Sequence, residues 1–365
     1  MKLTPILSAL IVGFAGIGAA NAQNSLTVPF EVESVSNPSL APESPGSVNL
    51  IRISPRYAIE SVEGERRSVL TLGAVIERSS DTSLSDDRNL PSVDYRLEFG
   101  SPTSAWVLQG MLEEVSTRST EFTDFGRVGI DSTQRTASLG AQWTGEMTPT
   151  SSLALGGGYL RVRYDTPLLI GYEELNVSAL YRMQVGERSR MYIDGRLARL
   201  DPVDDTRSSS RAGALAGYEV DLSDQVTFNA SLGVVRTSGL NRETDPVGGL
   251  GIAYEGDRLT SSLELVREVS ASGTVGGYDR VDALRGRLSY PVTPQTTLSL
   301  DLGHTRTLGL LRDQGTTVGV RVASELTEFW SLTFGVEQRR SKPQGMPSGS
   351  GHVIGLGLVY SHPNF

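Results

Sequence analysis

Apolar and polar residues alternate along most of the chain from Leu26 onward, in segments of about 9 to 15 residues. From Val226 to Val234 every second residue is apolar, and polar or small residues lie between. Similar alternation runs from Leu175 to Val185 and from Leu298 to Gly303. Because successive side chains of a strand point to opposite faces of a sheet, this period predicts an all-β fold with two chemically different faces.

The links between these segments are short and long in turn. Short links lie at 63–65, 186–187, 255–257 and 291–294, and the longer, polar links, rich in Gly and Pro, are Ser80 to Leu90, Ser116 to Ile130, Asp201 to Ser208, Ser238 to Pro246, Ala271 to Tyr278 and Arg340 to Gly349. Short periplasmic turns and longer external loops are typical of transmembrane barrels. A soluble all-β domain more often shows turn signals every 8 to 12 residues or so. The pattern therefore predicts a closed, antiparallel transmembrane β-barrel.

Counting the hairpins gives about 18 strands, an even number that places both termini on the periplasmic side. Pro29 interrupts the first segment, and a Pro-rich stretch follows from Asn37 to Gly46. If that segment is a periplasmic arm and one other assignment fails, the count falls to 16. No segment outside the strands is long and compact enough for a plug domain. Loops folded inward, with Ser116 to Ile130 and Ala271 to Tyr278 as candidates, or lumen side chains must then narrow the barrel.

A closed sheet in a membrane has one face toward lipid and one toward the lumen, because unpaired backbone groups are costly in hydrocarbon. The predicted lipid-facing residues are Leu70, Leu72, Ile76, Val93, Tyr95, Leu97, Phe99, Leu139, Trp143, Leu332, Phe334 and Val336. The predicted pore-lining residues are Glu77, Asp94, Arg96, Glu98, Arg182, Asp194, Arg196, Arg285, Arg287, Asp301, Arg321, Glu337 and Arg339. An arginine on the lipid face at mid-membrane would cost roughly 2–4 kcal/mol. This many charges on one face therefore require water or partners.

The charges on the lumen face suggest two arrangements. Arg285 and Arg287, with Arg321 nearby, could form a basic ladder that favours anions, opposite an acidic wall of Glu77, Asp94 and Glu98. Alternatively, these residues pair across neighbouring strands and add little specificity. The sequence leaves both arrangements open and identifies no solute, oligomeric state or inner-membrane partner.

The N-terminus has the composition of an export signal. Lys2 precedes an apolar run from Ile6 to Ala20, and Ala20-Asn21-Ala22 is a small-x-small cleavage pattern. We therefore expect a signal peptide at residues 1–22 and a barrel at residues 23–365, located in the outer membrane. A membrane-helix anchor is the weaker alternative, since the apolar run is short. After Ala22 no apolar run approaches the roughly 20 residues of a spanning helix.

Composition and motifs exclude several function classes. The chain has no cysteine, which removes disulfides, thiolate metal sites and a lipid-modified cysteine. A net charge of −9 without a basic tract argues against nucleic-acid binding. The acidic stretch Asp201 to Asp205 lacks a calcium-loop pattern and is expected to be a solvated loop, so we expect neither metal nor cofactor. With three histidines and no G-x-S-x-G elbow, an outer-membrane enzyme is a distant alternative.

The last strand resembles the signal that the barrel-assembly machinery reads. Ile354, Leu356, Leu358 and Tyr360 share one face, and Phe365 is the last residue. Phe365 is out of phase with Tyr360, and Pro363 interrupts the alternation, so this strand is expected to bulge or to end near Ser361. Outer-membrane lipid, lipopolysaccharide and the assembly machinery are therefore the expected partners.

From residue 23 to Phe365 the architecture resembles the outer-membrane β-barrel superfamily, and within it the beta-barrel porin 2 group that accompanies exopolysaccharide systems. The features that carry the resemblance are the signal segment, the strand count, the missing plug, the acidic pI of about 5.1 and the terminal phenylalanine. The resemblance implies a porin-like channel for passage or secretion of polysaccharide, with exopolysaccharide export components as partners. A structural or adhesive barrel with a closed lumen is the alternative.

Overall fold

The computed structural model describes residues 22–127, 130–203, 207–239, 242–309 and 312–365. Apart from Ala22, the expected signal peptide lies outside these residues, and so do parts of the predicted loops at 116–130, 201–208 and 238–246. Within the described residues, no helix is long and apolar enough to cross a membrane.

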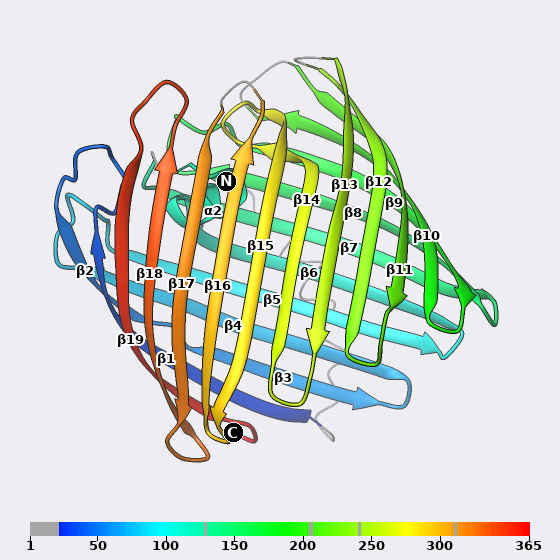
Figure 1. Ribbon diagram of the computed structural model, residues 1–365, viewed down its shortest axis with the longest axis horizontal. Coiled ribbons are helices and arrows are strands. Elements are labelled where there is room, and N and C mark those ends of the chain that lie inside the picture. The colour runs from blue at the N-terminus through cyan, green and yellow to red at the C-terminus, as the bar shows by residue number, and fades with distance from the viewer. Residues whose placement is uncertain (1–21, 128–129, 204–206, 240–241, 310–311) are drawn as a thin grey trace.

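The described chain is built almost entirely from antiparallel strands with one short helix (Figure 1). The elements are β1 (Ala22–Ser36), β2 (Ser47–Ile53), β3 (Arg56–Glu63), β4 (Arg66–Ser79), β5 (Arg88–Ser101), β6 (Ser104–Ser116), α2 (Thr117–Phe125), β7 (Thr133–Thr148), β8 (Ser151–Tyr164), β9 (Tyr172–Gly186), β10 (Ser189–Pro202), β11 (Ser209–Asp221), β12 (Val226–Ser238), β13 (Glu243–Glu255), β14 (Thr260–Ser272), β15 (Gly277–Thr293), β16 (Thr296–Thr307), β17 (Gln314–Glu325), β18 (Trp330–Lys342) and β19 (Gly349–His362).

Strands β2 and β3 together form a single barrel strand. Both pair with β1 and with β4, and only Ser54 and Pro55 separate them. The register is the same on both sides of the break, because Phe30 lies opposite Ile53 and Thr27 opposite Arg56. Proline has no N–H to donate, so Pro55 interrupts the ladder without turning the chain. The barrel thus has 18 strands, which confirms the larger of the two predicted counts.

The first strand closes the barrel. β1 pairs with β19 from Leu26, opposite His362, to Val35, opposite Val353. Pro29 lies inside this pairing. The first segment, whose place in the sheet was uncertain because of this proline, is therefore a full strand of the barrel. Closure leaves no free sheet edge, as a barrel in a bilayer requires.

The two ends of the barrel differ. Links of two to four residues join the strands at the end where Ala22 lies beside Ser61 and the C-terminus follows β19. Most of the longer links lie at the opposite end, called here the long-loop end. The link predicted from Ala271 to Tyr278 is shorter than expected. β14 continues to Ser272 and β15 begins at Gly277, so only residues 273–276 form the turn. Gly276 adopts a positive φ of 59°, which permits this tight reversal.

The two faces of the wall differ as the alternation predicted. Large apolar side chains lie exposed on the outer face, among them Leu72, Ile76, Phe99, Leu139, Leu332, Phe334 and Val336 from the predicted lipid-facing set. Leu70 is on the same face but only 2% exposed, because neighbouring side chains cover it. On the inner face, Val35, Val48, Leu50 and Val353 form an apolar cluster near the long-loop end.

Candidate functional site

The link between β6 and β7 folds into the barrel and forms α2 there, as one of the two loop candidates predicted (Figure 1). The helix ends at Gly126, whose φ of 73° is left-handed and whose N–H donates to the Phe122 carbonyl at 3.0 Å. A Cβ atom at Gly126 would lie 2.4 Å from the backbone nitrogen of Gly315 on β17. Only glycine therefore lets the end of α2 approach the opposite side of the barrel this closely.

Three hydroxyl groups fasten α2 to the lumen side of β14–β18, called here the far wall. Thr305 Oγ1 donates to the Thr123 carbonyl at 3.1 Å, and Thr307 Oγ1 to the Phe125 carbonyl at 2.8 Å. Ser341 Oγ donates to the carbonyl of Gly126 at 3.1 Å. Carbonyl groups at the end of a helix lack partners within it, and these hydroxyls supply them.

Arg127 anchors the tip of the loop in a buried ionic cluster. Its Nε lies 2.6 Å from Asp313 Oδ2, and one terminal nitrogen lies 3.1 Å from Asp279 Oδ2. The other terminal nitrogen donates to the hydroxyls of Ser272 and Thr274 at 3.2 and 2.9 Å. The Asp279 side chain is 1% exposed, so removing Arg127 would leave a buried carboxylate without this counter-charge.

The base of the same loop is fastened to the lumen side of β1–β5, called here the near wall. Asp131 forms ion pairs with Arg88 and, at 3.2 Å, with Arg118 of α2. Arg88 continues to Glu77 at 3.2 Å, and Glu77 to Arg52 at 2.6 Å. The loop is therefore anchored to both walls and spans the lumen between them.

Burial changes the titration of two acids on α2. It raises the pKa of Glu121 to about 7, although the Arg127 guanidinium 3.9 Å away works in the opposite direction. Burial also raises the pKa of Asp124, and Arg285 on the far wall opposes that change. The charge of α2 therefore depends on pH near neutrality.

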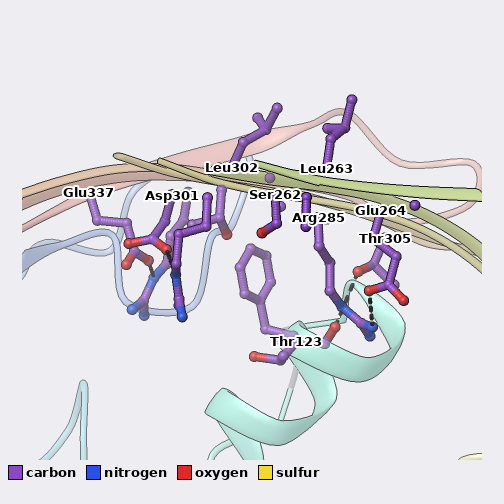
Figure 2. A pocket seen from close by; sticks show the side chains of 18 of the residues that line it. Thr123, Ser262, Leu263, Glu264, Arg285, Asp301, Leu302, Thr305 and Glu337 are labelled. Carbon is purple, nitrogen blue, oxygen red and sulfur yellow. Dashed lines mark hydrogen bonds and ion pairs between the residues drawn. The ribbon is translucent and has the colours of Figure 1, made fainter. Parts of the chain in front are cut away.

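A cavity of about 630 Å³ separates part of α2 from the far wall. Figure 2 shows Arg285, Glu264, Asp301 and Glu337 on the α2 side of the wall, while Leu263 and Leu302 point to the other side. The cavity's arginines each have an acidic partner: Arg285 with Glu264 at 3.8 Å, Arg287 with Asp301 at 2.8 Å, and Arg339 with Glu337. The first two pairs join neighbouring strands, as in the second arrangement left open by the sequence, whereas Arg339 and Glu337 both lie on β18.

A second cavity, of about 450 Å³, continues along the lumen side of β9–β14. It shares Asn229 and Glu264 with the first. Arg182, Asp194 and Arg196 line it, and Arg196 lies 2.6 Å from Asp194. The two cavities thus form a continuous polar lining along the lumen side of the barrel from β9 to the far wall.

The 13 residues predicted to line a pore fall into three groups. The first cavity includes Arg285, Arg287, Asp301, Glu337 and Arg339, the second includes Arg182, Asp194 and Arg196, and Glu77, Asp94, Arg96, Glu98 and Arg321 line neither. Glu77 is only 5% exposed, within the ionic cluster of the near wall. Arg96 pairs with Glu98 at 2.7 Å, and Arg321 lies opposite Ser299 and Gly335. A part in conduction remains a prediction for all of them.

Sequence reasoning missed the Arg127 cluster, although it selected the loop. Arg127 and Asp279 are 152 positions apart, and Arg127 and Asp313 are 186 apart. No local pattern joins such positions, because only barrel closure brings them together. The available signal was a single arginine after Phe125-Gly126 in a loop long enough to cross the lumen.

The C-terminal strand ends close to the expected place. β19 stops at His362, and Ile354 and Leu356 lie exposed on its outer face. Beyond the end of β19, Phe365 stays close to the first and last strands. Its N–H donates to the Asn24 carbonyl at 2.9 Å, and its ring centroid lies 5.8 Å from that of His362. Recognition of this strand by assembly machinery stays a prediction.

Comparison with known proteins supports the fold. No protein-family model and no curated protein matches the sequence. Among solved structures, the chain is similar to the outer membrane protein OpdK of Pseudomonas aeruginosa with vanillate, with a TM-score of 0.53 and 13% identity over 93% of this chain and 98% of OpdK. The chain is also similar to OpdQ from the same organism, with a TM-score of 0.54 and 9% identity over 94% of this chain and 98% of OpdQ.

A longer chain is also similar. The ferric enterobactin receptor PfeA of Pseudomonas aeruginosa, in mutant form, gives a TM-score of 0.53 and 10% identity over 94% of this chain and 81% of that one. At these identities the likeness establishes the fold alone, a closed barrel of the outer-membrane type. It confirms the predicted fold class and identifies no substrate.

Proposed function

We propose that this protein is an outer-membrane channel through which small polar solutes pass between α2 and the far wall. The observation that carries the proposal is that α2 crosses the lumen, is anchored on both walls, and leaves a charged cavity of about 630 Å³ beside it. A barrel of this strand number is wide enough for an aqueous interior, so a loop folded inward sets the width of the path. We place the short-turn end toward the periplasm, as single-chain bacterial barrels have it.

Paired charges on the far wall suit solutes that carry charge or several polar groups. The Arg285 and Arg287 side chains are 53% and 72% exposed, so both can meet a solute without leaving a buried site. The OpdK structure contains vanillate, an aromatic carboxylate. Small organic anions are therefore the first solutes to test.

Passage or secretion of polysaccharide is the finer expectation from the family resemblance. A polymer would need a wider path than the cavity beside α2, and α2 would have to leave the far wall. We therefore put small solutes before polysaccharide. A structural or adhesive barrel with a closed lumen is the alternative, and it predicts no conductance.

Planar-bilayer recording tests the channel directly. Folded wild-type protein should give discrete conductance steps. Arg127→Ala should give larger steps, because the loop tip loses its contacts with Asp279 and Asp313 and α2 can leave the far wall. Arg135→Ala is the matched control, since Arg135 pairs with Glu114 and Asp165 away from the lumen cavities.

Each outcome separates the candidates. Folded wild-type protein that stays silent favours the closed structural barrel and ends the channel proposal. Equal steps in wild type and Arg127→Ala would show that α2 does not set the width. Steps that grow equally in Arg135→Ala would trace the change to general loosening of the barrel.

A further inference from the structure

The outer face of β14–β18 carries excess positive charge near the long-loop end. We call this set the basic rim; it comprises Arg267 on β14, Asp282 on β15, Arg306 on β16, and Arg340 and Lys342 on β18. Lys342 is the only lysine after the N-terminal segment. Four cations thus share the rim with one acid.

Contacts of neighbouring residues fix the orientation of the basic rim. Thr305 and Thr307 both bond to α2 inside the barrel, so Arg306 between them points outward. Ser341 also bonds to the α2 loop, which places Arg340 and Lys342 on the outer face.

The rest of the rim follows from register. Asp282 lies opposite both Arg306 and Arg267, and paired residues of neighbouring strands point to the same side. Apolar side chains follow immediately toward the short-turn end, since Leu265 and Leu284 form the next pair on β14 and β15. The rim therefore borders the apolar band of the barrel.

Most of the positive charge on this rim is uncompensated. Arg267 forms a two-pronged pair with Asp282, at 2.6 and 2.8 Å. Arg340 donates to the hydroxyl of Ser348 at 3.0 Å. Among the residues that the structure describes, Arg306 and Lys342 make no ion pair.

The outer face of β6–β10 at the same end is different. Its ion pairs are Arg135 with Glu114 and Asp165, Arg161 and Arg163 with Glu173, and Arg199 with Asp201. Among the described residues of this rim, these four arginines meet four acids. The excess charge of the basic rim is thus local and is not a general property of the loop end.

An apolar hollow lies directly beside the basic rim. Its volume is about 950 Å³, and Leu232, Leu250, Leu265 and Leu284 line it, with Arg267, Asp282 and Arg306 at its edge. It is hollow because small residues, Ala216, Ala230 and Gly248, lie on neighbouring strands. Such a hollow can hold a hydrocarbon chain while the rim holds the headgroup.

We infer that the basic rim and this hollow bind a phosphorylated lipid of the outer leaflet, with phosphate at Arg306 and Lys342 and an acyl chain in the hollow. The inference rests on the proposed outer-membrane position. Arginine and lysine form charge-assisted bonds with phosphate, and basic residues at a membrane surface attract anionic headgroups. A zwitterionic lipid also supplies acyl chains but lacks the net negative charge.

The test measures lipid binding to the folded barrel in detergent by native mass spectrometry. The probes are lipid A, which carries two phosphates on a sugar headgroup, and phosphatidylcholine. We expect selective lipid A binding that weakens at least about twentyfold in the double variant R306E and K342E, since each basic residue at an anionic surface strengthens binding about fivefold. The control, R161E with R199E, reverses two charges on the opposite rim and should change binding less than about twofold.

Several results would overturn the inference. Equal binding of both lipids by wild-type protein would remove headgroup recognition, and equal loss in both double variants would reduce it to general surface charge. Competition by inorganic phosphate without any need for acyl chains would identify an ion site. A lipid-free oligomer that R306E with K342E converts to a monomer would assign the rim to a second copy of the chain.

Bilayer conductance of the same proteins separates this inference from the proposed function. Basic-rim residues lie outside the lumen, so R306E with K342E should conduct as wild type does. Conductance without selective lipid A binding would refute the lipid site alone. Selective binding by a silent barrel would support the lipid site and refute the channel.

Discussion

The near and far walls of the lumen both carry arginines paired with acids, but the pairs are buried on the near wall and exposed on the far wall. On the near wall the Glu77 and Arg88 side chains are 7% and 5% exposed and pair with each other. On the far wall Arg287 is 72% exposed while it pairs with Asp301. An arginine and an acid on the lumen face can therefore be either a structural cluster or a surface that solutes reach.

Loop packing makes the difference. Val35, Val48 and Leu50 of the near wall form an apolar cluster with Val353 of β19, and Leu84 from the β4–β5 loop packs against it. The β6–β7 loop reaches the charges themselves, since its Asp131 pairs with Arg88. The far wall instead borders the cavity beside α2. Ion pairs interact more strongly where water is excluded, but each buried charge then depends on its partner.

Removing one acid from each wall should give the largest difference between them. Glu77→Ala leaves the buried Arg88 and the half-buried Arg52 with less compensation, and we expect a loss of about 3–5 kcal/mol in the free energy of unfolding. Glu337→Ala breaks the partly exposed pair with Arg339 and should cost about 0–1 kcal/mol. Urea unfolding of the barrel in detergent measures both. Equal losses would show that the near-wall cluster is not a structural element.

Alternation was sufficient to predict the faces but not their accessibility. Glu77 and Arg287 both follow the lumen phase, yet one is buried in an ionic cluster and the other is open. Leu70 shows the same limit on the outer face, where its neighbours cover it. The phase of a strand depends on local sequence, whereas exposure depends on loops and strands that are distant in the chain.

Charge reversal on the far wall should change ion selectivity. R285E with R287E places two negative charges where two positive ones face the cavity, and leaves Glu264 and Asp301 beside like charges. Since two unit charges 4 Å apart interact by about 1 kcal/mol even in water, the anion-to-cation permeability ratio should fall at least about fivefold. Reversal potentials across a salt gradient measure this ratio.

The matched control for selectivity is Arg199→Glu. Arg199 is a similarly exposed arginine paired with an acid, but it lies on the outer face. It should leave the reversal potential unchanged. An unchanged potential in R285E with R287E would remove these residues from the ion path, and an equal shift in Arg199→Glu would assign the effect to overall charge.

Strand count, and the inward loop as one of two candidates, could be predicted because they depend on local patterns: alternation, link length and loop length. Closure followed from the cost of unpaired backbone groups in hydrocarbon. The anchoring of that loop could not be predicted. Thr305, Thr307 and Ser341 are ordinary small polar residues of alternating strands, and their bonds to α2 exist only because the loop reaches across the lumen. Register and long-range closure decide such contacts.

The smallest expected effect concerns the junction between the two walls, where Glu121 of α2 is buried beside Arg127 and near Asp124, Asp279 and Thr274. The docked carboxyl has a pKa of about 7, whereas in water a glutamate titrates near 4.3. Between these values, undocking of α2 releases a proton, so raising the pH weakens docking. Below about pH 4.3 Glu121 is protonated in both the docked and the undocked state, so pH does not change docking there. Above about pH 7 it is ionised in both states, and docking weakens no further.

Mean conductance should therefore rise modestly, up to about twofold, from pH 5 to pH 8, as α2 spends more time away from the far wall. Glu121→Gln stays uncharged throughout this range and should abolish the change. Glu43→Gln, an exposed acid in the β1–β2 loop, should leave the rise intact. A pH response that survives in Glu121→Gln would assign it to other groups, whereas a flat response in wild type would mean that α2 stays docked on the far wall across this range even with Glu121 ionised.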